Sequence, residues 1–357
     1  MPHKDRILHL NSSFLIIFAT RPRNTFINMK KIIVALFFAV AVLYSCKNDF
    51  DVNEDWKETM IVYGLLNPAD TAQYIKINKA FLGEGNALVM AGEFDSLNYT
   101  QGEINAVLEQ WNGTTLVQTI QLYLDTLIPK DTGVFASPDQ NLYKTSVPIV
   151  QNGSIYKLKV LNERTGKVVT SETPVVQTVS VNTPTPNQTI NIVGINPFKT
   201  KWTSAAEGRK YEVVVRFNYI EKLIFDTTQQ QQKHVDVFLG TFTSNTLNGG
   251  EVLETTINPD AFYSTLGKVI LPSNSVNYYY FNLEFIYSVA AENFTVYMDI
   301  VSTQSATFGD PPLFTNIQGG VGLFSSRYNK KVSNVKFSIA SYDSLRYGQY
   351  TEQLGFQ

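Results

Sequence analysis

The sequence predicts a mainly β protein, in which an N-terminal immunoglobulin-like β-sandwich is followed by a second β-rich domain with one or two short helices. Three observations support this fold class. The 357 residues include 19 Tyr and 23 Phe, and such side chains favour pleated, half-buried strands over helices. Apolar and polar residues alternate in several segments, which is the period of a half-buried strand. Turn signals separate these segments at short intervals, as in β-sandwiches.

The charge of the chain is unevenly distributed. Residues 1–45 hold six Lys or Arg side chains and one acid, Asp5. The chain has 29 basic and 31 acidic residues in all, so 23 basic and 30 acidic residues remain after that segment, a net charge of −7. Nucleic-acid binding needs a basic surface. We therefore exclude nucleic acid as a main partner.

A lipoprotein signal peptide is predicted at residues 29–45. Two lysines precede twelve uncharged residues, 32–43, a run that suits a secretory leader and is shorter than the roughly 20 apolar residues of a membrane span. The single cysteine, Cys46, follows Ser45 where this run ends. The pair resembles a lipobox, although Tyr44 departs from its preference for a small residue. We expect cleavage between Ser45 and Cys46 and lipidation of Cys46; the alternatives are an ordinary signal peptide or a membrane helix with an incidental Cys.

The residues on either side of this leader have separate interpretations. Residues 1–28 precede a complete leader, and we interpret them as a mis-annotated extension. Residues 46–58 form an acidic tether, in which Asp49 and Asp51 resemble the export signal that sends Bacteroidota lipoproteins to the outer face of the outer membrane. Several acyl chains on one Cys anchor a protein stably. We expect a lipid-anchored outer-membrane protein exposed at the cell surface, with a periplasm-facing orientation as the alternative.

The first predicted domain, residues 59–178, consists of short strands and turns. Asn112-Gly113 separates two β-rich runs and predicts a hairpin in which both turn residues have positive φ. A further Asn-Gly at residues 152–153 and Thr165-Gly166 are also turn signals. The antibody-type Cys pair is absent, so only the architecture is inferred. The predicted strands cover residues 60–66, 74–79, 107–111, 114–122, 155–161 and 168–176.

The second predicted domain, residues 188–345, follows a Pro-containing linker at residues 181–187. Asn258 and Pro259 form a helix-start signature, and residues 292–303 have helical apolar spacing. Residues 227–232 are expected to form a polar loop, and residues 346–357 a C-terminal tail. The predicted strands cover residues 211–219, 235–242 and 279–287, the last with Tyr279, Phe281, Leu283, Phe285 and Tyr287 on one face.

The sequence predicts no catalytic residue, metal site or cofactor. His234 is the only histidine after Cys46, and beside Lys233 at a strand start it is interpreted as a solvent-edge residue. The Gly-rich run at residues 319–322 lacks the Lys of a phosphate loop, and we interpret it as a strand where two backbones approach closely. Thirty acids make some carboxylate pair inevitable, so such a pair carries little information.

The three tryptophans are candidates for stacking on sugars. Trp111 and Trp202 are more simply explained as core residues, because Trp is usually buried. Trp56 lies in the tether and is expected to dock on the first domain.

Two segments, together with the lipobox and the acidic tether, resemble a Bacteroidota outer-membrane lipoprotein family of unknown function. One is residues 62–68, Val-Tyr-Gly-Leu-Leu-Asn-Pro, which opens the sandwich. The other is residues 309–324, where a Pro pair is followed by Asn316-Ile317 and a Gly-rich turn into a Phe strand. The resemblance covers residues 46 to about 345. It implies a fold and an envelope location, brings no functional residue other than Cys46, and associates the chain with outer-membrane transport systems.

The leading hypothesis is a non-enzymatic envelope lipoprotein, held in the membrane through Cys46, that serves as an accessory binding or scaffolding component of an outer-membrane, TonB-dependent uptake system. Its partner would be a β-barrel transporter. One alternative is a stand-alone carbohydrate-binding lipoprotein with aromatic platforms. The other is a hydrolase with a carboxylate pair across a cleft. The sequence does not predict the ligand or the residues that bind it.

Overall fold

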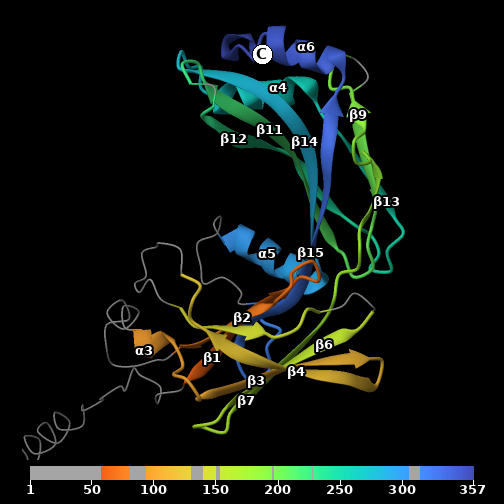
Figure 1. The fold of residues 1–357 in the computed structure, drawn as a ribbon. Coiled ribbons are helices and arrows are strands. Elements are labelled where there is room, and N and C mark those ends of the chain that lie inside the picture. Colours follow the sequence, from red (N-terminus) through yellow and green to blue (C-terminus); the bar gives the residue numbers. More distant parts are fainter. Residues whose placement is uncertain are drawn as a thin grey trace, which may run out of the picture. The chain divides into compact units, whose positions relative to one another are not determined.

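The computed structural model describes residues 58–80, 94–129, 140–149, 153–194, 197–226, 228–304 and 314–357 (Figure 1). The predicted fold class is confirmed, because these residues form a mixed 12-stranded sheet and a three-stranded sheet with few helices. No helix within these ranges is long and apolar enough to cross a membrane. Outside them lie Ser45, Cys46, Asp49, Asp51 and Trp56.

The described residues surround two hydrophobic cores. The first core collects residues from Met60 to Val175 together with Ile317 and Phe324. The second core collects residues from Val176 to Phe356. The strands that enclose mainly the first core are β1 (Thr59–Leu66), β2 (Tyr74–Ala80), β3 (Ile104–Asn112), β4 (Thr115–Asp125), β5 (Leu142–Thr145), β6 (Ile155–Asn162) and β7 (Val168–Pro174), with the short helix α3 (Phe94–Leu97).

The elements around the second core follow in the chain. The strands are β8 (Ser180–Thr183), β9 (Thr189–Ile190), β10 (Lys199–Thr203), β11 (Lys210–Leu223), β12 (Gln230–Thr243), β13 (Val252–Thr256), β14 (Val276–Ala290) and β15 (Val321–Phe337). The helices are α4 (Pro259–Val269), α5 (Glu292–Gln304), α6 (Ile339–Tyr347) and the 3-10 helix η1 (Glu352–Leu354). Leu354 and Phe356, in the segment that the sequence set apart as a tail, are buried in the second core.

The sheet around the first core is completed by the far end of the chain. Its strands run in the order β15-β1-β2-β5-β4-β3-β6-β7. β1 pairs with β15 in parallel, from Ile61 opposite Val321 to Leu66 opposite Ser326. At the other end, an isolated bridge joins Thr170 of β7 to Gln318 just before β15. Residues 321–326 therefore cover the β1 side of this β-sandwich-like sheet, and Gln318 pairs with one residue of β7 on the other side, which protects some of the backbone groups that an open edge would expose.

Gly322 allows β1 and β15 to pair. Its φ is +124°, and a Cβ atom there would lie 2.0 Å from the Val62 carbonyl oxygen. The Asn316 side chain fixes the approach of β15, because it donates to the Phe324 carbonyl oxygen at 2.6 Å and accepts from the Phe324 N–H at 2.9 Å. The close backbone approach predicted for the Gly-rich run is confirmed. The described ends of the two segments that carry the family resemblance thus meet as neighbouring strands, β1 and residues 321–324 of β15.

The β3–β4 hairpin forms as predicted but turns one residue later. Asn112 pairs with Thr115 as the last rung of the ladder, so Gly113 and Thr114 are the turn residues. Gly113 has a φ of +57°, whereas Asn112 is not among the residues with positive φ. The prediction that both Asn112 and Gly113 have positive φ is therefore wrong. Gly at the first turn position is the pattern of a type II′ turn.

A bulge changes the predicted face of β14. Leu283, Phe285 and Tyr287 are fully buried, as expected. The register between β11 and β14 then shifts between Asn218 and Tyr219, which leaves Phe281 49% exposed and turns the alternate tyrosines toward the core. The prediction that Tyr279 and Phe281 share the face of Leu283 is wrong, because a one-residue bulge reverses the alternation.

The two predicted helices are confirmed as α4 and α5. The Asn258 side chain caps α4 by accepting from the Ala261 N–H at 3.0 Å, one of the N–H groups that a helix start leaves unpaired. Figure 1 shows α4 and α5 on opposite faces of the sheet formed by β11, β12, β14 and β15.

Two segments predicted as irregular are partly strands. Val181 lies in β8, which pairs with β10, and Gln230 to Gln232 begin β12 and pair with β11. The linker and loop predictions are wrong at these residues, since ladder hydrogen bonds override a polar composition. Thr227 lies outside the described residues.

Candidate functional site

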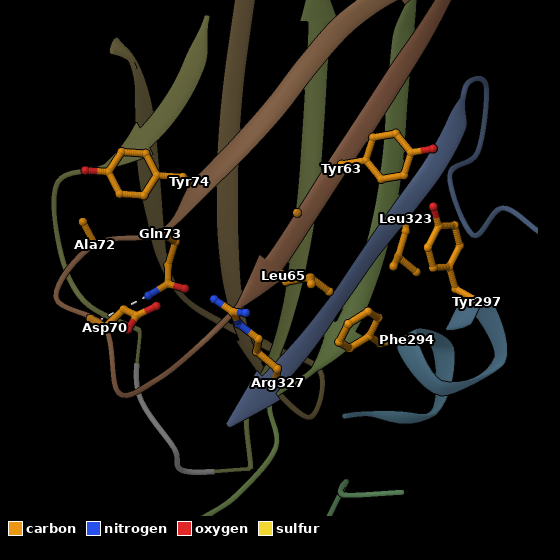
Figure 2. Close-up of a pocket in the computed structure, with 11 residues that line it drawn as sticks. Tyr63, Leu65, Asp70, Ala72, Gln73, Tyr74, Phe294, Tyr297, Leu323 and Arg327 are labelled. Atoms are coloured by element: carbon orange, nitrogen blue, oxygen red, sulfur yellow. Dashed lines mark hydrogen bonds between the residues drawn. The ribbon is translucent and has the colours of Figure 1, made fainter. Parts of the chain in front are cut away.

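An open cleft lies between α5 and the strands β1 and β15. It consists of two adjoining cavities of about 350 Å³ and 420 Å³, which is the size range of small-ligand sites. Phe294 of α5 and Arg327 of β15 line both cavities. We call the pair of cavities the α5 cleft; its first cavity, shown in Figure 2, is lined by Tyr63, Gly64, Leu65, Asp70, Ala72, Gln73, Tyr74, Phe294, Tyr297, Leu323 and Arg327.

Strand period places the β1 and β15 side chains on the cleft. Tyr63 is opposite Leu323 in the parallel ladder, and both line the first cavity. Successive side chains of a strand point to opposite faces, so Arg327 lies on the same face as Leu323 while Phe324 points into the first core. The pairing that closes the first sheet therefore also assembles the cleft from residues more than 250 positions apart.

Helix α5 is held against the sheet near its start and in its middle. Glu292 accepts a hydrogen bond from Arg209, and Asp299 forms an ion pair with Lys210 of β11. Beneath the helix, Thr295 is 6% exposed and Ser325 of β15 is fully buried. Neither hydroxyl has a hydrogen-bond partner among the described residues. Buried hydroxyls of this kind normally find a partner, so the contact between α5 and β15 is polar at these two residues.

Aromatic side chains form one wall of the first cavity. The rings of Tyr63 and Tyr297 meet edge to face with centroids 6.3 Å apart, and Phe294 lies beside them (Figure 2). Tyr63 nevertheless stays 42% exposed. Burial, and then the neighbouring Tyr297, raise the pKa of Tyr63. The Tyr63 hydroxyl also hydrogen-bonds with the Tyr297 side chain, so the two tyrosines form one polar edge of the wall.

The opposite end of the first cavity is a rigid loop. The buried Gln73 side chain accepts from the Asn67 N–H at 2.7 Å and donates to the Asn67 carbonyl oxygen at 2.9 Å. Its amide is therefore committed to the loop. Asp70 is exposed beside it, and its carboxylate forms no ion pair with a described residue. Of the two, Asp70 is the one whose side chain is available to a ligand.

Arg327 differs from the other arginines of the described ranges. Arg164, Arg209 and Arg216 each pair with carboxylates, and Arg346 lies over two tyrosine rings. The Arg327 side chain is exposed and makes no ion pair, hydrogen bond or ring contact with a described residue. Figure 2 shows its guanidinium between the aromatic wall and the Asp70–Gln73 end. A free guanidinium in a cleft presents five donors in a fixed fork.

The second cavity has a small floor between two cations. Ala290 of β14 is paired with Lys210 on one side and with Arg327 on the other. Its methyl group leaves a hollow between the two longer side chains, and the ion pair with Asp299 occupies the Lys210 ammonium. The next row along the sheet is polar, because Glu212, Ser288 and Asn329 also line this cavity. The cavity therefore offers hydrogen-bond donors and acceptors, with Arg327 as its free cation among the described residues.

The described residues hold no set that suggests covalent or metal chemistry. The carboxylates lining the cleft are Asp70, Glu212 and Asp299, and Asp299 is committed to Lys210. His234 is exposed on β12 and is not among the residues that line the cleft. No group of three His, Cys, Asp or Glu side chains in these ranges could hold a metal ion. The geometry suits binding.

Trp111 and Trp202, the two tryptophans within the described ranges, do not line this site. Trp202 is fully buried, as predicted. Trp111 is only partly buried, so its predicted core position is incomplete: Lys157 lies over its ring at 5.0 Å, and its Nε1–H donates to Glu109 at 2.9 Å. The predicted site residues around Cys46 are outside the described ranges, as is Trp56.

Sequence reasoning missed the residues of the α5 cleft. Tyr63 belonged to a segment singled out as a motif, and Phe294 and Tyr297 to a helical apolar face, but each pattern was equally typical of a core. Arg327 had no local signal except its place in a strand. No protein-family model matches the chain, and no curated protein matches it significantly.

Proposed function

We propose that the protein is a non-enzymatic, ligand-binding lipoprotein of the cell envelope, anchored through Cys46 at the outer membrane and exposed at the cell surface. In this proposal it is an accessory component of a TonB-dependent uptake system: the α5 cleft captures the ligand, and a β-barrel transporter receives it. The observation that carries the binding function is the α5 cleft, where the exposed ring of Tyr63, the half-buried rings of Phe294 and Tyr297 and an unpaired arginine meet. The anchor and the transporter rest on the sequence.

The charges of the cleft support binding over hydrolysis. A glycosidase of the usual kind needs two free carboxyl groups on opposite sides of its substrate. Glu212 and Asp299 line the same cavity, but Asp299 is held by Lys210. A hydrolase would lose its activity in Glu212→Gln, whereas a binding protein would show no turnover in either form. Release of reducing sugar by the parent protein and its loss in this variant would overturn the non-enzymatic assignment.

The accessory role is tested by crosslinking the natively expressed protein in outer membranes and identifying the recovered proteins by mass spectrometry. Stoichiometric recovery of a β-barrel transporter is the expected result. Cys46→Ser is the matched control, because it removes the acylated thiol and leaves the folded part unchanged. The variant should lose both acyl labelling and the transporter.

Recovery of the lipoprotein alone would overturn the accessory role. The aromatic wall of the α5 cleft favours a second candidate in that case, a stand-alone carbohydrate-binding lipoprotein. That candidate predicts glycan binding by the isolated protein without any transporter in the crosslinked sample.

A further inference from the structure

We infer that the α5 cleft binds a short acidic oligosaccharide, with the sugar carboxylate on Arg327 and a sugar ring against Tyr63, Phe294 and Tyr297. This inference rests on the proposed function of the cleft as a ligand site and adds the chemical class of the ligand.

The carboxylate follows from the state of Arg327. Its guanidinium has no anionic partner among the described residues, whereas the Lys210 ammonium nearby is already paired with Asp299. A guanidinium binds a carboxylate through two parallel N–H···O bonds. Because Arg327 lines both cavities, a carboxylate bound there would sit at their junction, with ligand on either side.

The sugar ring follows from the wall of the first cavity. Tyr63, Phe294 and Tyr297 present rings whose faces carry partial negative charge and attract positively polarised C–H groups. One face of a pyranose ring offers such C–H groups, and its hydroxyls point outward. The Tyr63 and Tyr297 hydroxyls, which hydrogen-bond to each other, and the Asp70 carboxylate supply polar groups for those hydroxyls. The first cavity, about 350 Å³, has room for one or two sugar residues.

The backbone under the cleft argues against an extended peptide. Peptides commonly bind by adding a strand to an open sheet edge. Here β1 lies between β2 and β15, and β14 lies between β11 and β15, so the backbone groups of β1 and β14 are already paired. Recognition must come from side chains. The second cavity offers several short polar ones for a ligand rich in hydroxyls: Glu212, Thr241, Ser288, Ser302 and Asn329.

The test is a binding screen of the full-length protein in detergent against matched glycan pairs. The probes are oligogalacturonates of two to four residues with their methyl esters, and sialyllactose with lactose. Each pair keeps the aromatic contact and changes only the acid or its sugar. We expect an acidic probe to bind at least tenfold more tightly than its neutral partner, the gain typical of charge-assisted hydrogen bonds. Calorimetry then gives the dissociation constants.

Two variants on β15 assign the carboxylate. Arg327→Gln should bind the acidic and the neutral member of a pair equally, a loss of at least tenfold for the acid. Lys336→Gln is the matched control, since it removes one exposed positive charge from the same strand outside the cleft. It should keep the preference for the acid. Circular dichroism spectra of the three proteins should coincide.

Two variants on α5 assign the ring. Phe294→Ala should weaken the acidic and the neutral probe by a similar factor, because an aromatic contact does not distinguish them. Val301→Ala, at a position on the same helix that is 43% exposed and outside the residues lining the cleft, should bind like the parent protein.

The failures are distinguishable. Equal binding of acidic and neutral probes, or a preference that persists in Arg327→Gln, would overturn the role of Arg327. Binding of free-acid peptides but not of their amides, with no glycan bound, would overturn the assignment of the ligand as a sugar. Recovery of a transporter in the crosslinking experiment without any glycan binding would overturn this inference and leave the accessory role standing. Glycan binding without recovery of a transporter would support this inference and overturn the accessory role.

Discussion

The two hydrophobic cores of this protein differ in how the chain builds them. The first core is mainly aliphatic and draws on β1 to β7, yet it also needs Ile317 and Phe324 from the far end of the chain. The second core is formed within residues 176–356 and is rich in aromatic side chains. The Phe217 ring, for example, lies against five other rings, those of Tyr219, Phe262, Tyr280, Phe337 and Phe356.

This difference separates two ways of stabilising a sheet. The second core gains from large rings, each of which buries much apolar surface. The first core depends on one long-range pairing, β1 with β15, whose loop-closure entropy is compensated only when both strands are in place. Substitutions in the second core should therefore lower the free energy of unfolding by the packing energy of the side chain that is removed. Substitutions at the β1–β15 ladder should instead lower stability by weakening the pairing of these two strands.

The largest expected effect is in the second core. Phe217→Ala should lower the free energy of unfolding by about 4 kcal/mol, since a large buried ring is replaced by a cavity. Urea denaturation followed by circular dichroism measures this loss. Phe238→Ala, on β12 and 60% exposed, is the control and should change stability by less than about 0.5 kcal/mol. Similar losses in both variants would contradict the assignment of Phe217 to the centre of the core.

The next effect sharpens the comparison at the β1–β15 ladder. Gly322→Ala should cost about 3 kcal/mol, because the new Cβ would meet the Val62 carbonyl oxygen and the positive φ is unfavourable for Ala. Gly166→Ala has a positive φ of +71° but nothing within 4 Å of the added atom, and it should cost about 1 kcal/mol. Urea denaturation gives both values.

Hydrogen exchange locates the damage from Gly322→Ala. Amides of β1 should lose protection while those of β11 keep it, because only the first sheet depends on this pairing. Equal costs for the two glycine variants, or equal loss of protection in β1 and β11, would break the proposed distinction between the cores.

A smaller effect compares one buried tyrosine from each core. Burial raises the pKa of Tyr211 to about 12 and that of Tyr143 to about 12. The folded state then keeps these protons more tightly than the unfolded chain, whose tyrosines titrate near pH 10. Their stabilising contribution is complete below about pH 10 and is lost as the pH rises toward 12. Each Tyr→Phe variant should therefore show a shallower loss of stability over this range in urea denaturation.

The two tyrosine variants should differ at neutral pH. The Tyr211 hydroxyl accepts from the Ala205 N–H at 2.8 Å, so Tyr211→Phe leaves a buried donor unpaired and should cost about 1–2 kcal/mol. The Tyr143 hydroxyl has no hydrogen bond to a described residue, and Tyr143→Phe should cost less than about 0.5 kcal/mol. An unchanged alkaline slope in both variants would show that these groups do not hold their protons as proposed.

The smallest effect is at the surface of the strands that enclose the second core. Arg216 of β11 donates to both carboxylate oxygens of Asp236 at 2.7 and 2.8 Å, and these hydrogen bonds hold the pKa of Asp236 below its ordinary value. Both side chains are partly exposed, so Arg216→Gln should cost only about 0.5 kcal/mol. The contribution is present above the ordinary pKa of Asp and disappears as the pH falls through the lowered pKa.

Thermal denaturation between pH 2 and 7 measures this surface effect. The difference between parent and Arg216→Gln should vanish in acid. Asp236→Asn should reproduce the neutral-pH loss without this pH dependence. A loss of several kcal/mol would mean that the pair is more buried than its exposure indicates.

The sequence pattern predicted the structure correctly where residues close together in the chain determine it. The Asn258 cap of α4, the strand that carries Val213 and Val215, and the burial of Trp202 were predictable from periodicity and side-chain type. The same reasoning failed at Phe281 and at the β3–β4 turn. There a shift of one residue in the pairing changes which side chains face the core or which residues turn, and pairing partners are not visible in the sequence of one strand.

The sequence by itself determined the mainly β class, most of the strands and two of the helices, because alternation, turn residues and helix caps act over a few residues. Only the tertiary structure decided that β15 completes the first sheet and that Tyr63, Phe294 and Arg327 share a cleft. The physical reason is separation along the chain. Backbone pairing between β1 and β15 brings these side chains together, and the fit that permits it, a glycine facing the Val62 carbonyl oxygen, exists only once both strands are in place.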